Sequence, residues 1–395
     1  MHFYKHKAIK KGLFFMSLKF SSNKSALLSV ITPALAATST KSTLPALEGL
    51  LFSLEDNILT VCGYDLEKGV KTSIPVYAKE DGAVILNAQK ISSIIKSFPE
   101  CEITFDTNDK NIVRITGAMS DFSIHGLAAE AFPNLPELGG DRSFSISQSL
   151  LRDIIISTHF SVAQTDARPI LTGELFKIEG RKLTVVALDN YRLALREEEN
   201  AVFGNETDYS FVVPGKTLLE FSRLLSDIEE MVIVEFTSKY IIFKIKDIIF
   251  FSRLLEGEFL DYNRAIPKQN KIFVKIRTED FIDSASRASL LVDEKLKTPL
   301  KCNFTDNILD ISCSTQYGRV NDNIKIEKSG EDIGIGFNGR YLLDALHACS
   351  DEYINVEMST PLMSMVIKPA VKKENSNYTY LVLPCRFSGR VFRFQ

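Results

Sequence analysis

The chain contains one sequence pattern three times, and this internal repeat constrains its fold more than any other feature. The first copy reads LPALEGLLF at residues 44–52, and the second reads RPILTGELF at residues 168–176. Each of these runs on into a Leu-Thr-Val strand and an aspartate, and a weaker third copy begins at Thr298-Pro299-Leu300. Since successive copies lie about 125 residues apart, the size of an ordinary domain, the repeat predicts three similar domains.

Each copy also has a second half, in which another strand ends and an amphipathic helix begins. These starts lie at residues 85–90, 212–217 and 336–341. The helix after the first start has apolar side chains at the spacing of one buried stripe, namely Ile91, Ile94, Ile95 and Phe98. Ser92, Ser93 and Lys96 are then expected to face elsewhere. Runs of β-branched residues such as 239–245 predict antiparallel strands after each helix.

These elements predict an α+β fold in which each domain is a doubled strand-helix-strands unit. Six helices should line one surface and the sheets the other, because each helix needs a sheet to cover its apolar stripe. Clusters of proline, glycine and polar residues at 136–141 and 267–270 mark the expected boundaries. The predicted parts are a disordered extension at residues 1–15, three domains at 16–139, 140–267 and 268–387, and a C-terminal extension at 388–395.

Composition limits the function. The net charge is −3, so any contact with nucleic acid must come from uneven placement of lysine and arginine. No apolar run approaches the roughly 20 residues that span a bilayer. The cysteines lack the spacing of zinc ligands, so we expect reduced thiols, a cytoplasmic location, and no metal or other cofactor. They are Cys62, Cys101, Cys302, Cys313, Cys349 and Cys385.

Two short motifs resemble nucleotide-binding sites but lack the surrounding pattern. Residues 334–339 satisfy GxGxxG, yet the other repeats lack these glycines and no parallel βαβ unit surrounds them. Gly215-Lys216-Thr217 matches the end of a P-loop, but the required upstream glycine position holds Ser210. The histidines fall in no motif for nucleophilic or metal chemistry. We therefore expect no catalysis, whereas an enzyme would turn over some substrate.

The size of the repeat fits a ring, on the condition that DNA is what the ring encloses. A domain of about 125 residues has a diameter of roughly 35 Å, so a ring with a DNA-sized hole needs about six of them. One chain supplies three, and closure would require a head-to-tail homodimer. The helices facing the hole carry basic residues beside acids such as Asp153, Glu220 and Asp344, and an ordinary solvated face is the alternative. The basic candidates are Lys24, Lys90, Lys96, Arg152, Lys216, Arg223, Arg287 and Arg340.

Several motifs in one order carry a family likeness from Ser17 to Phe387. Residues 168–173, 187–194, 251–259 and 380–386 resemble the beta subunit of bacterial DNA polymerase III. The resemblance implies three DNA-clamp domains per chain, which form half of a six-domain ring with helices inside and sheets outside. It implies a non-catalytic homodimer that encircles duplex DNA, is loaded by an ATP-driven clamp loader, and gives polymerases processivity. A monomeric peptide-binding scaffold is the rival, and it would show neither a dimer nor a preference for closed DNA.

The resemblance also implies a hydrophobic pocket between the second and third domains. Replicative and repair polymerases, the clamp loader and mismatch-repair proteins would bind there through short peptides rich in Gln, Leu and Phe. Leu193, Leu381 and Leu383 could instead be plain core, whereas Arg192 and Arg386 are expected to be exposed and would lack a packing reason. The matching positions are Leu171, Asn190, Tyr191, Arg192, Leu193, Leu260, Arg264, Ala265, Asn338, Tyr341, Leu362, Ser364, Leu381, Val382, Leu383, Pro384, Cys385 and Arg386.

By the same likeness, Phe122 and Ile124 would meet Leu290 and Leu291 of a second copy, although all four could be ordinary buried positions. Lys41 and Thr165 match loop positions that touch DNA.

Three departures from the family pattern concern the pocket. Asn190-Tyr191 replaces a small residue and histidine, and Leu260 replaces proline, so the peptide preference is expected to be shifted. The chain also continues for residues 388–395 beyond the usual end of the family. We hypothesise that Phe392 or Phe394 folds back as an internal competitor, and a disordered extension is the alternative.

Overall fold

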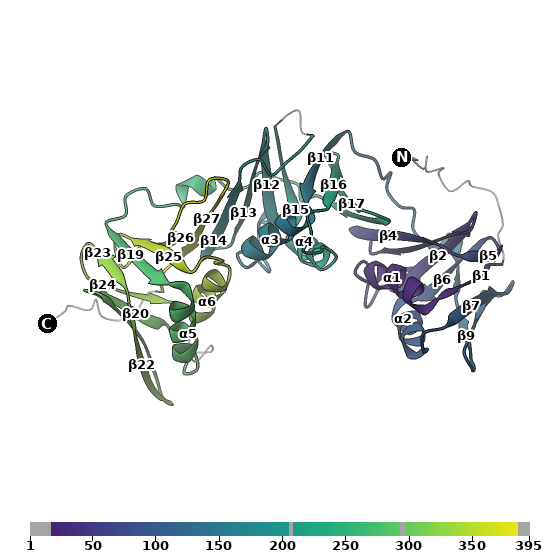
Figure 1. Ribbon diagram of the computed structural model, residues 1–395, viewed down its shortest axis with the longest axis horizontal. Coiled ribbons are helices and arrows are strands. Elements are labelled where there is room, and N and C mark those ends of the chain that lie inside the picture. Colours follow the sequence, from purple (N-terminus) through teal and green to yellow (C-terminus); the bar gives the residue numbers. More distant parts are fainter. Residues whose placement is uncertain (1–16, 205–207, 293–297, 386–395) are drawn as a thin grey trace. The chain divides into compact units, whose positions relative to one another are not determined.

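The computed structural model describes residues 17–204, 208–292 and 298–385, which fall into two compact units. The first unit comprises the residues up to Arg142 together with Ile233–Arg253, and the second comprises Ser143–Val232 together with the residues from Leu254 onward. Helices and antiparallel strands make up both units (Figure 1). The six α-helices of the described residues agree with the number predicted from the repeat.

The first unit holds two antiparallel sheets and two helices. One sheet has the order β5-β1-β7-β8-β9, and the strands of the other lie in the order β10-β6-β2-β3-β4-β18-β17-β16. The elements of this unit are β1 (Lys19–Asn23), α1 (Lys24–Leu35), η1 (Pro45–Glu48), β2 (Gly49–Glu55), β3 (Ile58–Tyr64), β4 (Lys68–Pro75), β5 (Tyr77–Glu80), β6 (Gly82–Asn87), α2 (Ala88–Ser97), β7 (Glu102–Thr107), β8 (Ile112–Gly117), β9 (Ser120–His125), β10 (Leu127–Ala128), η2 (Ala129–Ala131), β16 (Met231–Phe236), β17 (Tyr240–Ile245) and β18 (Ile248–Arg253).

The second unit repeats this design with a nine-stranded sheet, a four-stranded sheet and four helices. The strand orders are β15-β12-β13-β14-β27-β26-β25-β19-β23 and β22-β21-β20-β24. The elements are β11 (Arg142–Ser147), α3 (Gln148–His159), η3 (Pro169–Thr172), β12 (Gly173–Glu179), β13 (Lys182–Leu188), β14 (Arg192–Glu198), β15 (Tyr209–Pro214), α4 (Gly215–Ser222), η4 (Tyr262–Arg264), β19 (Ile272–Arg277), α5 (Thr278–Ser289), β20 (Leu300–Thr305), β21 (Ile308–Thr315), β22 (Gly318–Lys325), β23 (Glu327–Ser329), β24 (Ile333–Phe337), α6 (Gly339–His347), β25 (Tyr353–Met358), β26 (Met365–Pro369) and β27 (Ser376–Val382).

The helices pack in three pairs, α1 with α2, α3 with α4, and α5 with α6, and each pair lies against sheet strands (Figure 1). In α2 the predicted stripe is confirmed, because Ile91, Ile95 and Phe98 are buried and Ile94 packs against the same core. Ser92 was expected to face away from this stripe, and its side chain is nevertheless buried. The neighbouring helix α1 covers part of α2 beside the sheet-facing stripe, so more of the helix is buried than one stripe of apolar residues indicates.

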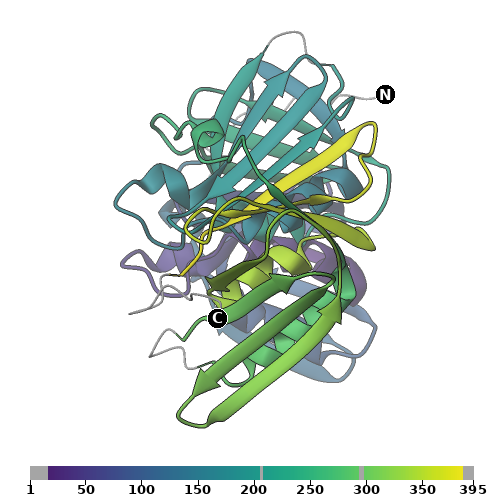
Figure 2. The same cartoon turned by 90° about the vertical axis from the view of Figure 1, so that its left-hand side faces the viewer.

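Strand pairing joins segments that are far apart in the sequence, and it does so twice in the same way. In the first unit β4 pairs with β18, and Gly69 lies opposite Phe251. A Cβ at Gly69 would meet the Phe251 ring at 2.1 Å, so only glycine leaves room for that ring. In the second unit β14 pairs with β27, with Leu193 opposite Leu381. Figure 2 shows β27 in yellow beside the teal strands of this sheet.

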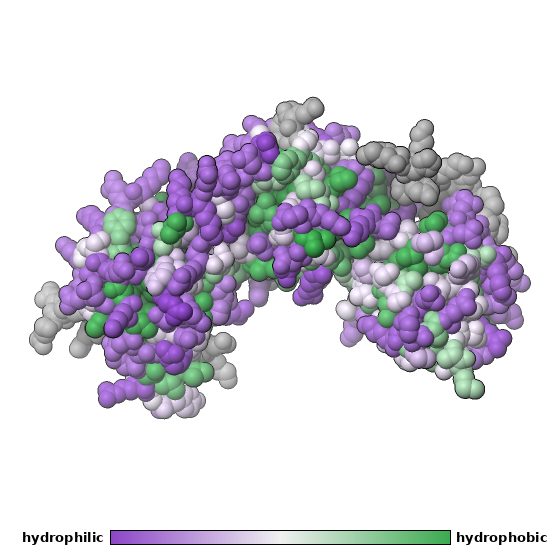
Figure 3. Space-filling model, viewed as in Figure 1, coloured by the Kyte–Doolittle hydropathy of each residue, from purple (hydrophilic) through white to green (hydrophobic). Residues whose placement is uncertain are grey.

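The surface drawn in Figure 3 is mostly hydrophilic, and the buried apolar side chains gather in cores. One of these cores lies in the second unit and includes Phe281, Phe304, Phe337 and Tyr380, all fully buried. In the first unit Phe20 and Phe105 stack with ring centroids 4.8 Å apart inside the core. None of the described helices has the length and apolarity required to cross a membrane.

A buried carboxyl group lies between α3 and β12. The Glu174 side chain is inaccessible to solvent, with Oε2 2.6 Å from the Thr158 hydroxyl and Oε1 3.2 Å from Nδ1 of His159. Burial raises the pKa of Glu174, and its two hydrogen bonds offset only part of that rise. The Thr158 hydroxyl also lies 2.8 Å from the Ile154 carbonyl. Thr158 donates to the Glu174 carboxyl, so its contact with the Ile154 carbonyl shares the same hydroxyl proton.

Glu174→Gln should remove one source of pH dependence from the stability. The folded pKa of Glu174 lies above the model value of 4.5, so its contribution is fully present below that value and is lost as the pH rises through the folded pKa. Glutamine keeps the shape and a donor but has no proton to lose. Urea unfolding from about pH 5 to about pH 8 should therefore show a smaller fall in unfolding free energy for the variant.

Glu179→Gln, at the exposed end of the same strand, is the matched control and should leave this pH dependence unchanged. An identical slope for Glu174→Gln and the wild type would show that Glu174 does not titrate in this range.

Candidate functional site

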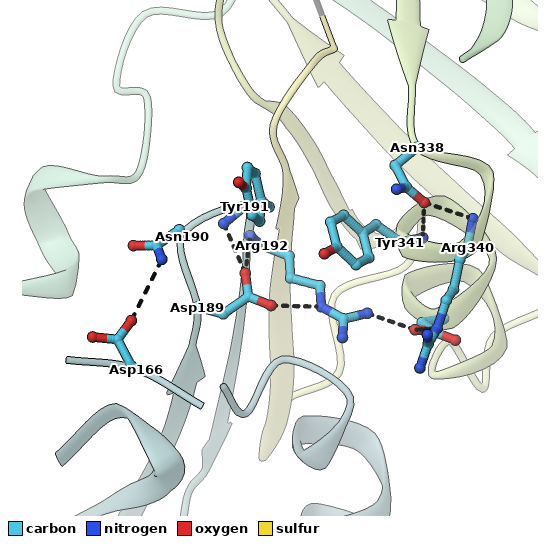
Figure 4. Close-up of polar contacts among 9 residues, drawn as sticks. Asp166, Asp189, Asn190, Tyr191, Arg192, Asn338, Arg340 and Tyr341 are labelled. Carbon is cyan, nitrogen blue, oxygen red and sulfur yellow. Dashed lines mark hydrogen bonds and ion pairs between the residues drawn. The ribbon is translucent and has the colours of Figure 1, made fainter. Parts of the chain in front are cut away.

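Arg192, at the start of β14, is at the centre of a polar network in the second unit (Figure 4). Its Nε lies 3.1 Å from Oδ2 of Asp189, and its Nη1 lies 2.5 Å from Oδ2 of Asp344 on α6. The guanidinium carbon is 4.5 Å from the centroid of the Tyr341 ring. The sequence-based expectation of an exposed Arg192 was wrong, because only 7% of the side chain is accessible. Pairing of β14 with β27 brings α6 over it, and two carboxylates compensate the buried charge.

Tyr191 stands beside this network with its ring partly open to solvent. Its ring stacks on Tyr341, with centroids 5.6 Å apart and planes 27° from parallel, and 54% of the residue is exposed. The backbone of Tyr191 is fixed on both sides. Its N–H donates to Oδ1 of Asp189 at 2.7 Å, and its carbonyl accepts from the Leu383 N–H at 2.8 Å. The ring therefore projects from a backbone that cannot easily move.

Asn190 is turned away from Tyr191 toward Asp166 (Figure 4), and Arg168 contacts both of these side chains. The Asn190 Nδ2 lies 3.4 Å from Asp166, and the Asn190 Oδ1 accepts from Nη2 of Arg168 at 3.3 Å. The Arg168 N–H and guanidinium also donate to Asp166 and hold the pKa of that carboxyl below its usual range. The loop that contains Thr165 is thus attached to the residue beside Tyr191.

Asn338 caps α6, because its Oδ1 accepts from the N–H groups of Arg340 and Tyr341 (Figure 4). The cap fixes the helix turn that carries Tyr341. Nearby, the Cys385 N–H donates to the Gly336 carbonyl at 2.8 Å, and burial raises the pKa of the Cys385 thiol. The GxGxxG glycines therefore close an antiparallel strand and open a helix, without the parallel strands of a dinucleotide site.

The predicted pocket residues separate into three groups by exposure. Leu193 and Leu381 are buried in one cluster with Leu171, as the core interpretation predicts, whereas Leu383 is 43% exposed and is not core. Val382 belongs to another core on the opposite face of β27, so only its backbone faces the site. Ser364 is also buried, and Asn338, Tyr341, Pro384 and Cys385 are half-buried. The exposed members are Asn190, Tyr191, Leu260, Arg264, Ala265, Leu362 and Leu383.

The remaining predicted residues lie in two segments. Leu260, Arg264 and Ala265 lie in and beside η4, a segment whose Phe259, Tyr262 and Ile266 pack against the cluster of Leu171, Leu193 and Leu381. Arg386 and the tail containing Phe392 and Phe394 lie outside the described residues.

The two acids that hold Arg192 were not predicted as part of the site. Asp189 could have been found, since an aspartate two and three residues before the N–H groups that it accepts is a turn signal. Asp344 had no local signal, because it lies 152 residues away from Arg192 in the sequence.

Comparison with known proteins identifies the family. Three family models of the DNA polymerase III beta subunit match the chain, for the N-terminal domain at residues 18–136, the central domain at 145–261 and the C-terminal domain at 263–386. The chain belongs to the DNA polymerase III beta subunit family. Membership confirms the predicted fold class of three clamp domains and the prediction of a non-catalytic subunit. The domain boundaries proposed from the sequence stay predictions.

Individual relatives agree with this assignment. The beta sliding clamp of Bacillus subtilis is 30% identical over 380 residues, which cover 93% of this chain and 100% of that protein. The beta sliding clamp of Halalkalibacterium halodurans is 33% identical over 350 residues, or 84% of this chain and 91% of that one. The crystal structure of the Bacillus subtilis DNA polymerase sliding clamp has a TM-score of 0.89 at 29% identity and covers 94% of this chain and 99% of that one.

The residues predicted to face DNA lie on the helices of all three clamp domains. Each of α1 to α6 carries at least one of them, Arg223 directly follows α4, and Lys41 and Thr165 lie in loops. Some are engaged within the chain. Lys24 donates to the Phe98 carbonyl, and Arg287 lies 2.5 Å from Asp322. Arg152 is half-buried. The exposed candidates are Lys41, Lys90, Lys96, Thr165, Lys216, Arg223, Arg287 and Arg340.

The residues predicted to join two copies lie at or near sheet edges. Phe122 and Ile124 are half-buried on β9, the edge strand of the five-stranded sheet, where Phe122 meets Phe98 at 5.5 Å between ring centroids. Leu290 follows α5 and is 84% exposed, whereas Leu291 packs against the core. Strand β22, which packs against α5, is likewise the edge of its sheet.

Proposed function

We propose that this protein is a cytoplasmic DNA sliding clamp that works as a head-to-tail homodimeric ring around duplex DNA. It tethers replicative and repair polymerases to their template and performs no reaction of its own. The observation that carries the proposal is the match of all three domains, in order, to one family whose relatives are beta sliding clamps. The clamp loader and mismatch-repair proteins would share its peptide-binding site.

Ring closure is supported by the sheet edges. Each chain has a free edge at β9 in the first unit and another at β22 in the second. Exposed edge strands readily pair with another chain, and two different edges on one chain give the head-to-tail contact that a ring requires. Phe122 and Ile124 at one edge, with Leu290 and Leu291 near the other, would add apolar contacts across each joint.

The partner-peptide site is supported by exposed apolar side chains beside a rigid polar network. Tyr191, Leu260, Leu362 and Leu383 are exposed to between 39% and 75%, and together they would form the kind of contiguous apolar patch that marks a binding surface. The buried cluster of Leu171, Leu193 and Leu381 would form the floor beneath them. Polar groups of Asn338 and the Arg192 network fix the surrounding backbone and would orient a peptide.

The ring is tested by topology. The protein is loaded onto nicked circular DNA with a clamp loader and ATP, and the DNA is then linearised. Retention on circular DNA in high salt, with release from linear DNA through its ends, would support encirclement. A protein held only by phosphate contacts would be lost in high salt from circular and linear DNA alike. Equal retention before and after linearisation would contradict it and would favour a peptide-binding scaffold that binds DNA along its side.

A further inference from the structure

The turn that carries Tyr191, from Asp189 to Arg192, has a counterpart in the first unit. This counterpart is the turn from Asp65 to Lys68, at the β4–β18 pairing. There Asp65 accepts from the N–H groups of Glu67 and Lys68 at 3.0 and 2.8 Å. In the second unit Asp189 accepts from Tyr191 and Arg192 at 2.7 and 2.9 Å. The two turns thus have the same hydrogen bonds, and each ends in a buried cation that pairs with its aspartate, Lys68 in one and Arg192 in the other.

The following strand completes the likeness. The Glu67 carbonyl accepts from the Arg253 N–H at 2.8 Å, as the Tyr191 carbonyl accepts from the Leu383 N–H at 2.8 Å. Tyr191 therefore corresponds to Glu67, and Leu383 corresponds to Arg253. The same backbone carries two exposed charged residues in one unit and an exposed aromatic and leucine in the other. The fold does not require Tyr191 or Leu383, so their chemistry needs another explanation.

Tyr191 packs on side chains that hold one another in place. The Tyr341 ring contacts both the Tyr191 ring, with centroids 5.6 Å apart, and the Arg192 guanidinium, 4.5 Å from the Tyr341 centroid. Arg192 is fixed by Asp189 and Asp344 and lies 5.7 Å from the Phe160 ring centroid on another side. A ring held this way loses little conformational entropy when a second ring packs on it.

The charges around Tyr191 are already paired within the chain. Arg192 bonds to Asp189 and Asp344, and Arg168 bonds to Asp166. The Asn190 amide is also turned toward Asp166 (Figure 4). The turn therefore presents to a partner an aromatic face beside the exposed Leu383. The charges of Arg192 and Arg168 are already compensated by aspartates of the chain. An uncharged aromatic side chain complements this surface better than a charged or amide side chain does.

We propose that Tyr191 determines partner specificity by selecting peptides that place an aromatic side chain against its ring. This inference rests on the proposed function of the site as a peptide-binding site. An aromatic pair adds to the affinity beyond the area that it buries, by roughly 2- to 10-fold in Kd. Peptides with the aromatic residue in that position should bind more tightly than peptides with leucine there.

The test uses fluorescent peptides with a constant Gln-Leu core, in which phenylalanine or leucine occupies each flanking position in turn. Binding is measured by fluorescence anisotropy to the full-length wild type, Tyr191→Leu and Tyr191→Phe. One flanking position should show roughly 2- to 10-fold tighter binding of phenylalanine to the wild type. Tyr191→Leu should bind both peptides of that pair equally, because the apolar bulk remains and the ring does not. Tyr191→Phe should keep the preference.

Glu67→Leu, in the corresponding turn of the first unit, is the matched control. It should leave the affinities for the phenylalanine peptide and the leucine peptide of that pair unchanged. A preference that survives in Tyr191→Leu would overturn the inference, and so would a wild type that binds all peptides without any aromatic preference. Failure of every peptide to bind the wild type would overturn the proposed peptide site and this inference with it. The two failures are therefore distinguishable.

Discussion

Replacing Arg192 by alanine should lower the free energy of unfolding by about 3 kcal/mol, because it leaves carboxylates without their cation. Asp189 is 14% exposed and would lose its buried partner, whereas Asp344 is 34% exposed and can gain water. The expected cost therefore lies at the lower end of the range for broken buried pairs. Tyr341 also loses the guanidinium that packs on its ring. Urea unfolding followed by circular dichroism measures the effect as a lower transition midpoint.

Arg277→Ala provides the control for this experiment. Arg277 also pairs with two carboxylates, Glu279 and Asp280, but 43% of its side chain is exposed, as are 70% and 46% of theirs, and exposed ion pairs contribute little. Its removal should change the unfolding free energy by less than about 1 kcal/mol. Similar losses in the two variants would mean that the Arg192 network contributes no more to stability than a surface ion pair does.

Leu290→Asp should convert the proposed dimer into a monomer. Leu290 is 84% exposed in the single chain, so the change should not disturb the fold, but in the ring it would place a carboxylate in an apolar joint. We expect the dimer Kd to rise at least roughly 100-fold, since an unpaired charge in such a place costs several kcal/mol. Sedimentation velocity should show a species near 44.3 kDa instead of twice that mass.

The matched control is Val371→Asp, which introduces the same charge at a residue that is 74% exposed in the loop between β26 and β27. It should remain dimeric and stay on circular DNA, whereas Leu290→Asp should lose both properties. A dimer of unchanged stability in Leu290→Asp would place the joint elsewhere on the chain.

The local structure was largely predictable from short-range sequence pattern. The stripe of Ile91, Ile95 and Phe98 defined one face of α2, and the run at 239–245 matched β17, because helical and strand periods are properties of neighbouring residues. Ser92 shows where this reasoning stops. A stripe indicates which side of a helix meets the sheet, but it does not indicate that a second helix covers an adjacent side.

The candidate site was predictable as a set of positions but not as a geometry. Family motifs indicated Tyr191, Arg192 and Tyr341 together, and the structure brings these three into one stack. The same motifs gave no sign that Arg192 is buried or that Val382 faces another core. Both follow from the pairing of β14 with β27, which decides the neighbours of each side chain.

The sequence by itself determined the threefold repeat, the type of each element and the family, because repeats, periodicity and motifs are all contained in residue order. Only the tertiary structure decided which charges are buried and which rings are presented to a partner. Arg192 meets Asp344 across 152 residues, and Tyr191 meets Leu383 through a bond between strand ends. Such contacts depend on strand pairing between distant segments, and no local pattern in the chain encodes which distant residue will lie opposite.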